Sequence, residues 1–364
     1  MKIAILGIRG VPARYGGFET CAEELGKRLA NKGYEVWVYC RSSYYKEKLK
    51  NYLGIKLIYL PSIEIKFLET LSHTFLSLVH ALFRKYDILV VFNNANSPLL
   101  IFHSLIGKKI ILNVDGLEWK REKWGFLGKK YYKFAEWLST KLSIELIADS
   151  KEIKKYYKEK YKKNVNYIPY GADLKFSENK SILKKFDLEP GEYFLQITRF
   201  EPENNPLFTV RAFEMLNTNK KLVMVGGVKY KSKYSEEIYS TQDKRIKFLG
   251  FVYDRDILRE LLCNCYAYIH GNEVGGTNPA LLEAMASGCF VICRNVPFNR
   301  EVLQDAGIYF EKDVRDLREK LRWSLVNSEK IKKLGEEARK IIKKNHDWDF
   351  ILEQYEKLFK KLVK

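Results

Sequence analysis

The stretch His270-Gly-Asn-Glu-Val-Gly-Gly-Thr-Asn-Pro-Ala-Leu-Leu-Glu-Ala-Met-Ala-Ser-Gly288 joins the end of a strand, a glycine loop and the start of a helix. Gly275 and Gly276 allow the backbone to approach a ligand closely. Asn278 suits the N-cap, and Pro279 suits the first helical position, where its missing N–H costs nothing. Because unpaired N–H groups at a helix start bind anions, the stretch predicts a phosphate site.

The same helix carries one acidic side chain, Glu283, four residues after Pro279. This spacing places Glu283 on the face of the first turn, while Leu281, Leu282 and Met285 are better placed to face a core. A carboxylate in that position can bind sugar hydroxyls. Taken alone, the stretch also fits an ordinary capped helix after a strand, so the interpretation depends on the rest of the chain.

Length and composition predict two folded domains. The chain has 364 residues, which is too long for one typical core, and 30% of them are charged. A net charge of +19 predicts affinity for a polyanion, either nucleic acid or an anionic membrane surface. The first apolar run is too short for a secretion signal and no uncharged stretch could span a bilayer, which favours a cytoplasmic location.

Short apolar runs alternate with helical patterns, as expected for doubly wound parallel sheets. The runs are 3–6, 35–40, 56–59, 87–92, 109–114, 144–148 and 165–168, then 193–198, 221–225, 245–249, 265–270, 289–294 and 307–310. We therefore predict two similar α/β domains, over residues 1–175 and 176–348. The apolar spacing in 349–364 predicts a helix that crosses back to the first domain. Two facing domains of this kind would enclose a cleft beyond the carboxyl ends of their strands.

Two loops of the first domain carry candidate site residues. The loop 7–20 lacks the G-x-G-x-x-G spacing of a dinucleotide site, but Gly16 and Gly17 at a helix start suit close approach to a diphosphate. The loop 113–124 follows an apolar strand and carries acids, bases and two tryptophans. Asp115 is its candidate to accept a hydroxyl proton or to orient an acceptor sugar.

In the second domain, Arg199 follows a predicted strand and is expected to face the cleft. An arginine there can neutralise the charge that builds on a departing diphosphate. The alternative is an ion pair with Glu201 or Glu203. His270 ends another strand, where it either orients substrate or makes a structural hydrogen bond.

We expect no metal and no cofactor. Asp254 and Asp256 are better explained by a helix cap than by a metal site. The six cysteines lie on or beside apolar runs without the spacing that zinc requires, so we expect reduced thiols.

Three blocks carry a resemblance to a known family: Gly-Val-Pro-Ala-Arg-Tyr-Gly-Gly-Phe-Glu-Thr at 10–20, Val-Asp-Gly-Leu-Glu-Trp-Lys-Arg at 114–121 and Gly-Gly-Thr-Asn-Pro-Ala-Leu-Leu-Glu-Ala-Met at 275–285. Along nearly its whole length the chain is similar to retaining family-4 glycosyltransferases with two Rossmann-like domains, the GT-B fold. The blocks resemble a branch that includes bacterial rhamnosyltransferases acting on lipid-linked N-acetylglucosamine.

The resemblance implies that a sugar, with rhamnose as the best single candidate, passes from a nucleoside-diphosphate sugar donor to a lipid-linked saccharide acceptor. It implies that Arg199 clamps the donor diphosphate and that Glu283 holds the nucleotide ribose. Other donor contacts implied by the resemblance are those of Gly16, Gly17, Val252, Gly276, Thr277, Asn278 and Pro279.

The sequence departs from the family pattern at two positions of the clamp. Gly275 stands where a carboxylate is usual, and Glu273 is a possible substitute. Asn204 stands where a second cation, a lysine, is usual. Three residues could supply that cation, namely Arg9, Arg14 and Lys229.

The patterns at 129–138 and 151–163 combine lysines with aromatic residues, and 67–83 is the most apolar helix candidate. Such helices are typical of proteins at an anionic membrane surface, although a solvated Lys/Glu face or a core helix explains them equally well. We expect a protein on the inner face of the plasma membrane with no nucleic-acid partner. Two alternatives remain: a sugar-nucleotide epimerase of the same fold, and a non-catalytic basic scaffold that binds membrane or nucleic acid.

Overall fold

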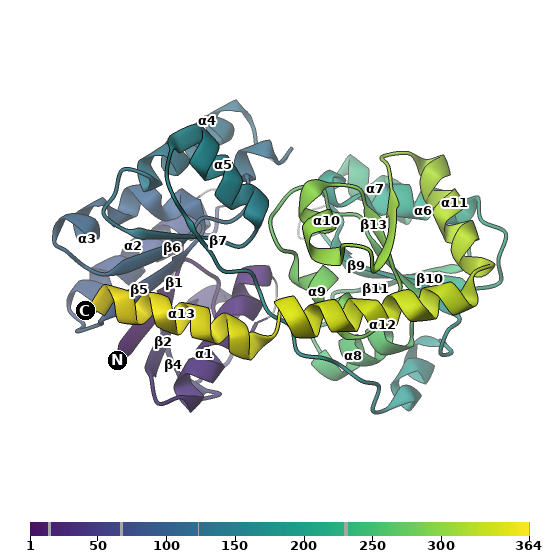
Figure 1. Cartoon of the computed structure of the whole chain (residues 1–364), viewed down its shortest axis with the longest axis horizontal. Helices are drawn as coiled ribbons and strands as arrows, with labels where there is room; N and C mark the ends of the chain where they lie inside the picture. The colour runs from purple at the N-terminus through teal and green to yellow at the C-terminus, as the bar shows by residue number, and fades with distance from the viewer. Residues whose placement is uncertain (14–15, 66–67, 123, 229–231, 364) are drawn as a thin grey trace. The chain divides into compact units, whose positions relative to one another are not determined.

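The computed structural model describes residues 1–13, 16–65, 68–122, 124–228 and 232–363. The chain forms two compact units (Figure 1). The first consists of Met1–Tyr170 with Trp348–Lys364, and the second of Gly171–Asp347. Each unit is an α/β structure built on one largely parallel sheet, which confirms the predicted fold class.

The sheet of the first unit has eight strands in the order β3-β4-β2-β1-β5-β6-β7-β8. All neighbours are parallel except β3 and β4. The strands are β1 (Lys2–Leu6), β2 (Glu35–Arg41), β3 (Asn51–Tyr52), β4 (Ile55–Leu60), β5 (Ile88–Phe92), β6 (Ile110–Asn113), β7 (Glu145–Ala148) and β8 (Asn166–Tyr167). The seven predicted strands are confirmed, and β3 was missed. It is a two-residue strand folded onto β4 by Leu53 and Gly54, whose φ values of 50° and 80° suit a tight hairpin.

The helices of the first unit cover both faces of its sheet. They are α1 (Gly17–Asn31), α2 (Leu68–Leu82), α3 (Ile101–Leu105), α4 (Phe126–Ser139), α5 (Lys151–Tyr161) and α13 (Trp348–Val363). The C-terminal helix α13 packs against α1, as predicted. Lys32 Nζ lies 2.7 Å from Glu356 Oε2, and the Arg28 guanidinium lies 5.2 Å from the centre of the Trp348 ring.

The sheet of the second unit has six parallel strands in the order β11-β10-β9-β12-β13-β14. All six predicted strands are confirmed: β9 (Tyr193–Arg199), β10 (Lys221–Gly227), β11 (Ile246–Gly250), β12 (Ala267–His270), β13 (Val291–Arg294) and β14 (Gly307–Phe310). Its helices are α6 (Pro206–Glu214), α7 (Lys233–Tyr239), α8 (Arg255–Asn264), α9 (Pro279–Ala286), α10 (Pro297–Leu303), α11 (Val314–Leu325) and α12 (Ser328–Asn345).

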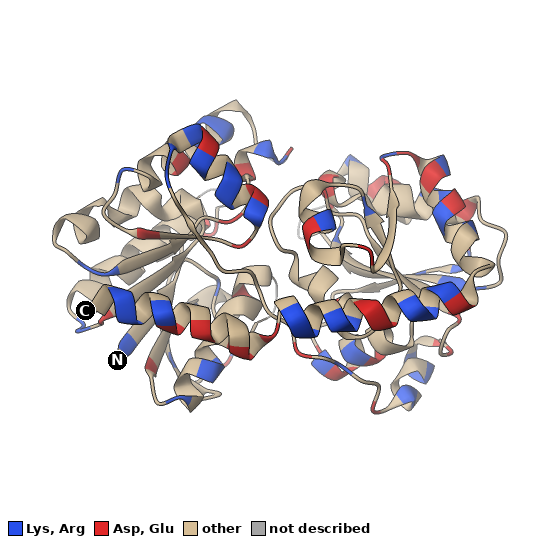
Figure 2. Cartoon of the chain, viewed as in Figure 1, with Lys and Arg blue, Asp and Glu red and all other residues tan. Residues whose placement is uncertain are grey.

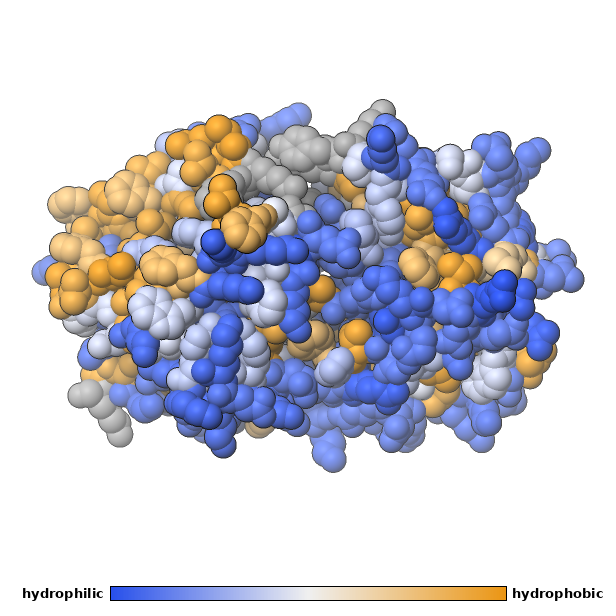
Figure 3. Space-filling model, turned by 90° about the horizontal axis from the view of Figure 1, so that it is seen from above, coloured by the Kyte–Doolittle hydropathy of each residue, from blue (hydrophilic) through white to orange (hydrophobic). Residues whose placement is uncertain are grey.

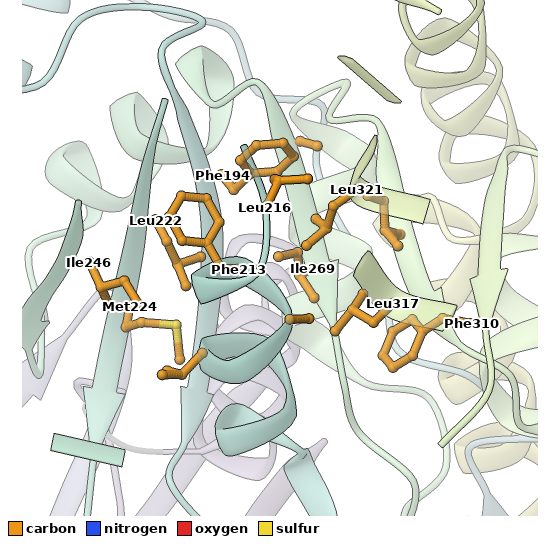
Figure 4. Packing of buried hydrophobic residues seen from close by; sticks show 14 of the residues in the cluster. Phe194, Phe213, Leu216, Leu222, Met224, Ile246, Ile269, Phe310, Leu317 and Leu321 are labelled. Atoms are coloured by element: carbon orange, nitrogen blue, oxygen red, sulfur yellow. The ribbon is translucent and has the colours of Figure 1, made fainter. Parts of the chain in front are cut away.

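The core of the second unit lies between its sheet and helices α6 and α11 (Figure 4). Phe194 of β9 and Phe213 of α6 meet with their ring centres 6.0 Å apart. Met224, Ile269 and Leu317 extend the cluster and are fully buried. Burial of so many large apolar side chains holds β9, β10 and β12 in register, and the loops at the carboxyl ends of these strands therefore have a rigid base.

A buried carboxylate joins α8 to the segment that enters the second unit. Glu260 accepts hydrogen bonds from the backbone N–H of Glu178 at 2.7 Å and of Asn179 at 2.9 Å. Ser177 Oγ at 2.7 Å and Asn264 Nδ2 at 3.0 Å complete the set. Burial alone would raise the pKa of Glu260, but the four donors outweigh it and lower the pKa to about 2.

We expect the ionised Glu260 to stabilise the second unit by an amount that depends on pH. Because its folded pKa is depressed, the contribution is complete above the ordinary carboxyl pKa and is lost as pH falls toward about 2. Its size is on the order of 3 kcal/mol. Glu260→Gln should therefore lower the free energy of unfolding at neutral pH. Below pH about 4.5, the free energy of unfolding of this variant should decrease less steeply with falling pH than that of the original chain. Urea unfolding measures both effects.

The matched control is Glu337→Gln, which changes an exposed carboxylate on α12. That variant should keep both the stability and the pH dependence of the original chain. Equal unfolding curves for Glu260→Gln and Glu337→Gln would contradict the role of Glu260.

Candidate functional site

The loop 271–278 between β12 and α9 has the local structure that the sequence predicts. Asn278 is the N-cap of α9, where its Oδ1 accepts the backbone N–H of Ala280 at 3.0 Å, and Pro279 is the first helical residue. Gly275 has φ +150°, a conformation that strains other residues. Thr277 is buried in the turn before the helix. The start of α9 is thus fixed by its own cap.

The loop after β9 lies directly against this turn. Asn205 Nδ2 donates to the carbonyl of Gly271 at 2.8 Å, and the backbone N–H of Glu273 donates to the carbonyl of Glu203 at 2.9 Å. A Cβ atom on Gly271 would lie 2.3 Å from the carbonyl oxygen of Asn204, so only glycine fits. The structure therefore brings the loops of Arg199 and of residues 276–279 together at one edge of the sheet.

Arg199, the last residue of β9, is half-buried. Within the described part of the chain, no carboxylate forms an ion pair with its guanidinium, so the alternative pairing with Glu201 or Glu203 is not formed. Asn204 holds the turn after the strand, because its Nδ2 donates to the carbonyl of Arg199 at 2.9 Å. The positive charge of Arg199 thus has no acidic partner in its own unit.

His270 ends β12 and is fully buried. Burial lowers the pKa of its imidazole to about 3, so the ring is neutral at physiological pH. Its Nε2 has no hydrogen-bond partner among the described residues. His270 Nε2 can therefore form a hydrogen bond with a ligand, but the neutral ring cannot add a positive charge to the site.

Glu283 projects from α9 and remains half-buried. Its Oε1 lies 3.4 Å from Lys175 Nζ, an ion pair in partial contact with solvent that contributes little stability. The carboxylate keeps acceptor capacity for hydroxyl groups.

Val252 follows β11 and is half-buried, and its two neighbours in the sequence, Phe251 and Tyr253, have exposed rings. Phe251 and Tyr253 stack with their centres 6.1 Å apart and an interplanar angle of 4°. The sequence analysis singled out Val252 and missed the pair, although aromatic residues on both sides of it were visible.

Glu273 is engaged within its own unit. Its carboxylate lies 2.9 Å from Arg294 Nε and 2.8 Å from Lys312 Nζ. The two cations tie the loop 271–278 to β13 and to the segment after β14. Glu273 is therefore a loop anchor within the second unit.

In the first unit, two acidic side chains of α1 hold the segment 9–13 that follows β1. Glu19 Oε1 accepts the backbone N–H of Arg9 at 2.9 Å, and Glu23 Oε2 accepts that of Ala13 at 2.5 Å. Gly16 is the N-cap of α1, which begins at Gly17. The sequence analysis missed these carboxylates, which occupy N–H groups that an anion could otherwise use. Arg9 Nη1 lies 3.9 Å from Glu19, while Arg14 and Lys229 lie outside the described residues.

Asp115 follows β6 with φ +62°, an uncommon conformation for a residue other than glycine. Its backbone N–H donates to Asn113 Oδ1 at 3.0 Å. Trp119, in the same loop, donates from Nε1 to the buried Glu136 at 3.1 Å. Glu136 of α4 also accepts Tyr156 OH at 2.7 Å and Lys160 Nζ at 3.0 Å. The Asp115 loop is thus anchored to α4 and α5, through a glutamate that the sequence analysis did not select.

The aspartates after β11 form a helix cap, as predicted. Asp254 Oδ1 accepts the backbone N–H groups of Asp256 at 2.9 Å and of Ile257 at 3.1 Å. The described side chains include no group of three His, Cys, Asp or Glu residues placed to bind a metal. The six cysteines are free thiols in this structure.

Comparisons with known proteins relate the two halves of the chain to two families. Residues 1–173 match a family described as a domain of unknown function (DUF1972), and residues 178–341 match the family glycosyl transferases group 1. The chain is 28% identical to O-antigen chain mannosyltransferase B of Escherichia coli over 39% of its own length and 38% of that protein. It therefore covers well under two thirds of that relative.

Solved structures resemble the chain over its full length. Sucrose-phosphate synthase from Thermosynechococcus elongatus has a TM-score of 0.83 and 17% identity, with 99% of this chain and 98% of that chain covered. The Anabaena protein HepE in complex with UDP-glucose has a TM-score of 0.79 and 16% identity, with 99% and 100% covered. The fold is thus the GT-B fold. The family match over residues 178–341 relates the second unit to glycosyl transferases group 1.

Among the described residues, none of the helices combines the length and the apolar composition needed to pass through a bilayer.

The contact between Gly271 and Asn204 allows a test of the loop geometry. Gly271→Ala should push the two loops apart, because the new methyl group would lie 2.3 Å from the Asn204 carbonyl oxygen. We expect the free energy of unfolding to fall by about 1–3 kcal/mol, measured by urea unfolding. Gly125→Ala is the control, since nothing lies within 4 Å of its Cβ position. A Gly271→Ala variant as stable as the control would refute the close approach.

Proposed function

We propose that the chain transfers a sugar from a nucleoside-diphosphate sugar to a lipid-linked saccharide acceptor with retention of the anomeric configuration, in the synthesis of a cell-surface polysaccharide. Rhamnose is the first candidate for the sugar. The observation that carries the proposal is that the guanidinium of Arg199 has no carboxylate partner in its unit. Arg199 is the last residue of β9, which pairs with β12, and β12 leads into the capped start of α9. A cation and a helix start on neighbouring strand ends suit a diphosphate.

In the proposed reaction the bond between the sugar and the diphosphate breaks, and the negative charge that builds on the leaving group is stabilised by Arg199 and by the positive end of the α9 dipole. The acceptor hydroxyl attacks the same face of the sugar, and its proton passes to the leaving phosphate. Glu283 accepts hydroxyl groups of the nucleotide ribose. No bound metal is required, since Arg199 and the helix start supply the compensating positive charge.

Asp115 is the proposed acceptor-side residue. Its left-handed backbone and the bond from its N–H to Asn113 set the carboxylate at the carboxyl end of β6. The anchor formed by Trp119 and Glu136 keeps the loop in place. There Asp115 can orient the acceptor hydroxyl. Gly16 and Gly17 are the donor contacts proposed for the same unit.

Two other candidate functions give different results in simple assays. An epimerase would convert the sugar nucleotide without any acceptor. A basic scaffold would bind a polyanion in a strongly salt-dependent way and show no thermal shift with nucleotides. The unpaired Arg199 favours the transferase over the scaffold, because a scaffold has no need of a cation at the carboxyl edge of the sheet.

The donor prediction is tested by thermal shift with UDP, GDP, dTDP and ADP and their sugars, without added metal. We expect one nucleotide series to raise Tm, with dTDP first in order, because ligand binding to the folded state alone stabilises it. No rise in Tm with any of them would contradict the proposed donor site.

Arg199→Ala and Glu283→Ala test the roles of the two side chains in transfer. We expect Arg199→Ala to lower kcat/KM by roughly a hundredfold or more, because the leaving diphosphate loses its cation. Glu283→Ala should chiefly raise KM for the donor. Sugar transfer to a lipid-linked acceptor is the measurement, and Arg211→Ala is the control, since it removes an exposed arginine of α6 that pairs with Glu237. Normal turnover in both site variants would remove the assignment.

A further inference from the structure

The first unit exposes large apolar side chains on three consecutive helical segments. Phe83, just after α2, is 84% exposed, and Leu105 at the end of α3 is 80% exposed. Phe126 and Leu127, at the start of α4, are 71% and 79% exposed. Smaller exposed fractions belong to Phe75, Leu76, Val79, Ile101, Phe102, Ile106, Phe134 and Trp137. A folded domain rarely leaves so many large side chains in water without a partner for them.

These segments lie on one face of the sheet. Right-handed crossovers place α1, which leads from β1 to β2, on one face, and α2 to α5, which lead in the opposite direction along the sheet, on the other. His103 Nε2 donates to the carbonyl of Leu78 at 3.1 Å, which joins α3 to α2. The backbone N–H of Ser143 donates to Ser104 Oγ at 3.1 Å, which joins α3 to the segment after α4.

We name the exposed apolar surface of α2, α3 and α4 the α2–α4 face. Figure 3 shows hydrophobic residues gathered over the first unit, in contrast to the largely hydrophilic second unit. The contiguity of the three segments makes this face a single surface.

Exposed lysines outnumber exposed acids beside the α2–α4 face, with Asp87 and Glu122 among the exposed acids there. Exposed lysines belong to the three segments or follow them, namely Lys85, Lys109, Lys130, Lys133 and Lys141. The acids of α2 and α4 contribute little negative charge to this surface. Glu136 is buried, and Glu69 lies 3.4 Å from Arg41. In Figure 2 the helices α2 and α3 are almost free of charge.

The next helix along the sheet, α5, adds to the positive charge. A shallow hollow of about 450 Å³ on it is lined by Lys155, Lys158, Glu159 and Lys162. Three of its four lining residues are thus basic, and α5 covers the same face of the sheet as α2 to α4.

We propose that the α2–α4 face docks on an anionic phospholipid bilayer, with Phe83, Leu105, Phe126 and Leu127 entering the headgroup layer and the neighbouring lysines on the lipid phosphates. An apolar surface bordered by lysine matches both parts of such an interface. A second copy of the chain fits less well, because a symmetric contact would place lysines of the two copies opposite one another. The inference rests on the proposed function for its purpose, which is to bring the enzyme to a lipid-linked acceptor.

Flotation with phosphatidylcholine vesicles, with and without phosphatidylglycerol, tests the docking surface on the full chain. We expect binding to vesicles that contain phosphatidylglycerol and a large loss of binding at high salt. Phe126→Ser with Leu127→Ser should lower the partition coefficient by roughly tenfold or more, because two exposed apolar side chains are removed. Lys130→Gln and Lys133→Gln should each lower it roughly fivefold on anionic vesicles only.

Val326→Ser is the matched control, since Val326 is 78% exposed on the second unit. It should leave vesicle binding unchanged. Leu105→Ser provides a second apolar variant on a different helix, in case the double variant is unstable. Equal vesicle binding by the original chain and the α2–α4 variants would overturn the proposal. A chain that binds no vesicles, but forms a dimer in light scattering that Leu105→Ser dissociates, would also overturn it.

Transfer activity separates this inference from the proposed function. With a water-soluble short-chain acceptor, the α2–α4 variants should retain the rate of the original chain and lose rate only on acceptor embedded in vesicles. Vesicle binding without any sugar transfer would refute the proposed function and leave the docking surface in place. Transfer to both acceptors at equal rates in all variants would refute the docking surface alone.

Discussion

The hydrogen bonds between the loops after β9 and β12 are the constraint on which the candidate donor site depends. Asn205 reaches 66 residues along the sequence to the Gly271 carbonyl, and the absence of a Cβ at Gly271 lets the two backbones meet. Because β9 and β12 are neighbours in the sheet, this contact fixes the end of Arg199's strand relative to the start of α9. The buried cluster around Phe194 and Phe213 supports both strands from below, so the loops have little freedom to separate.

The carboxyl edge of the second unit's sheet has fewer cations available for a diphosphate than the family resemblance implies. Asn204 stands at the position of a second cation and is used to hold the Arg199 carbonyl, and the neutral imidazole of His270 contributes no charge. Glu273 is balanced by Arg294 and Lys312. The positive charge described at this edge of the second unit is therefore that of Arg199 together with the partial charge at the helix start. A site of this kind depends more strongly on one arginine than a site with two cations.

Much of the fold could be predicted from the sequence because strands buried on both faces give continuous apolar runs, and all thirteen such runs are strands in the structure. The two-residue strand β3 gives no such run, and its turn begins at Leu53, a residue without a turn preference. The anchors of the site are different. Trp119 and Glu136 are 17 residues apart, and Glu273 and Lys312 are 39 apart. Each residue looks like an ordinary surface charge or aromatic until the tertiary structure pairs it.

Apolar periodicity also could not show which apolar residues lie in the core. The pattern at 67–83 fits a buried helix and an exposed one equally well, since periodicity reports only that apolar side chains share a side. The structure resolves this by giving α2 two apolar sides: Leu78 packs inward while Phe75 and Val79 stay in water. Buried residues of α2 include His73, Thr74 and Ser77. The inward side of α2 thus mixes polar and apolar residues, while its outward side carries large apolar side chains that a surface helix normally keeps buried. Apolar side chains left in water contribute nothing to burial unless another apolar medium covers them, and this is the physical reason to assign the α2–α4 face a partner.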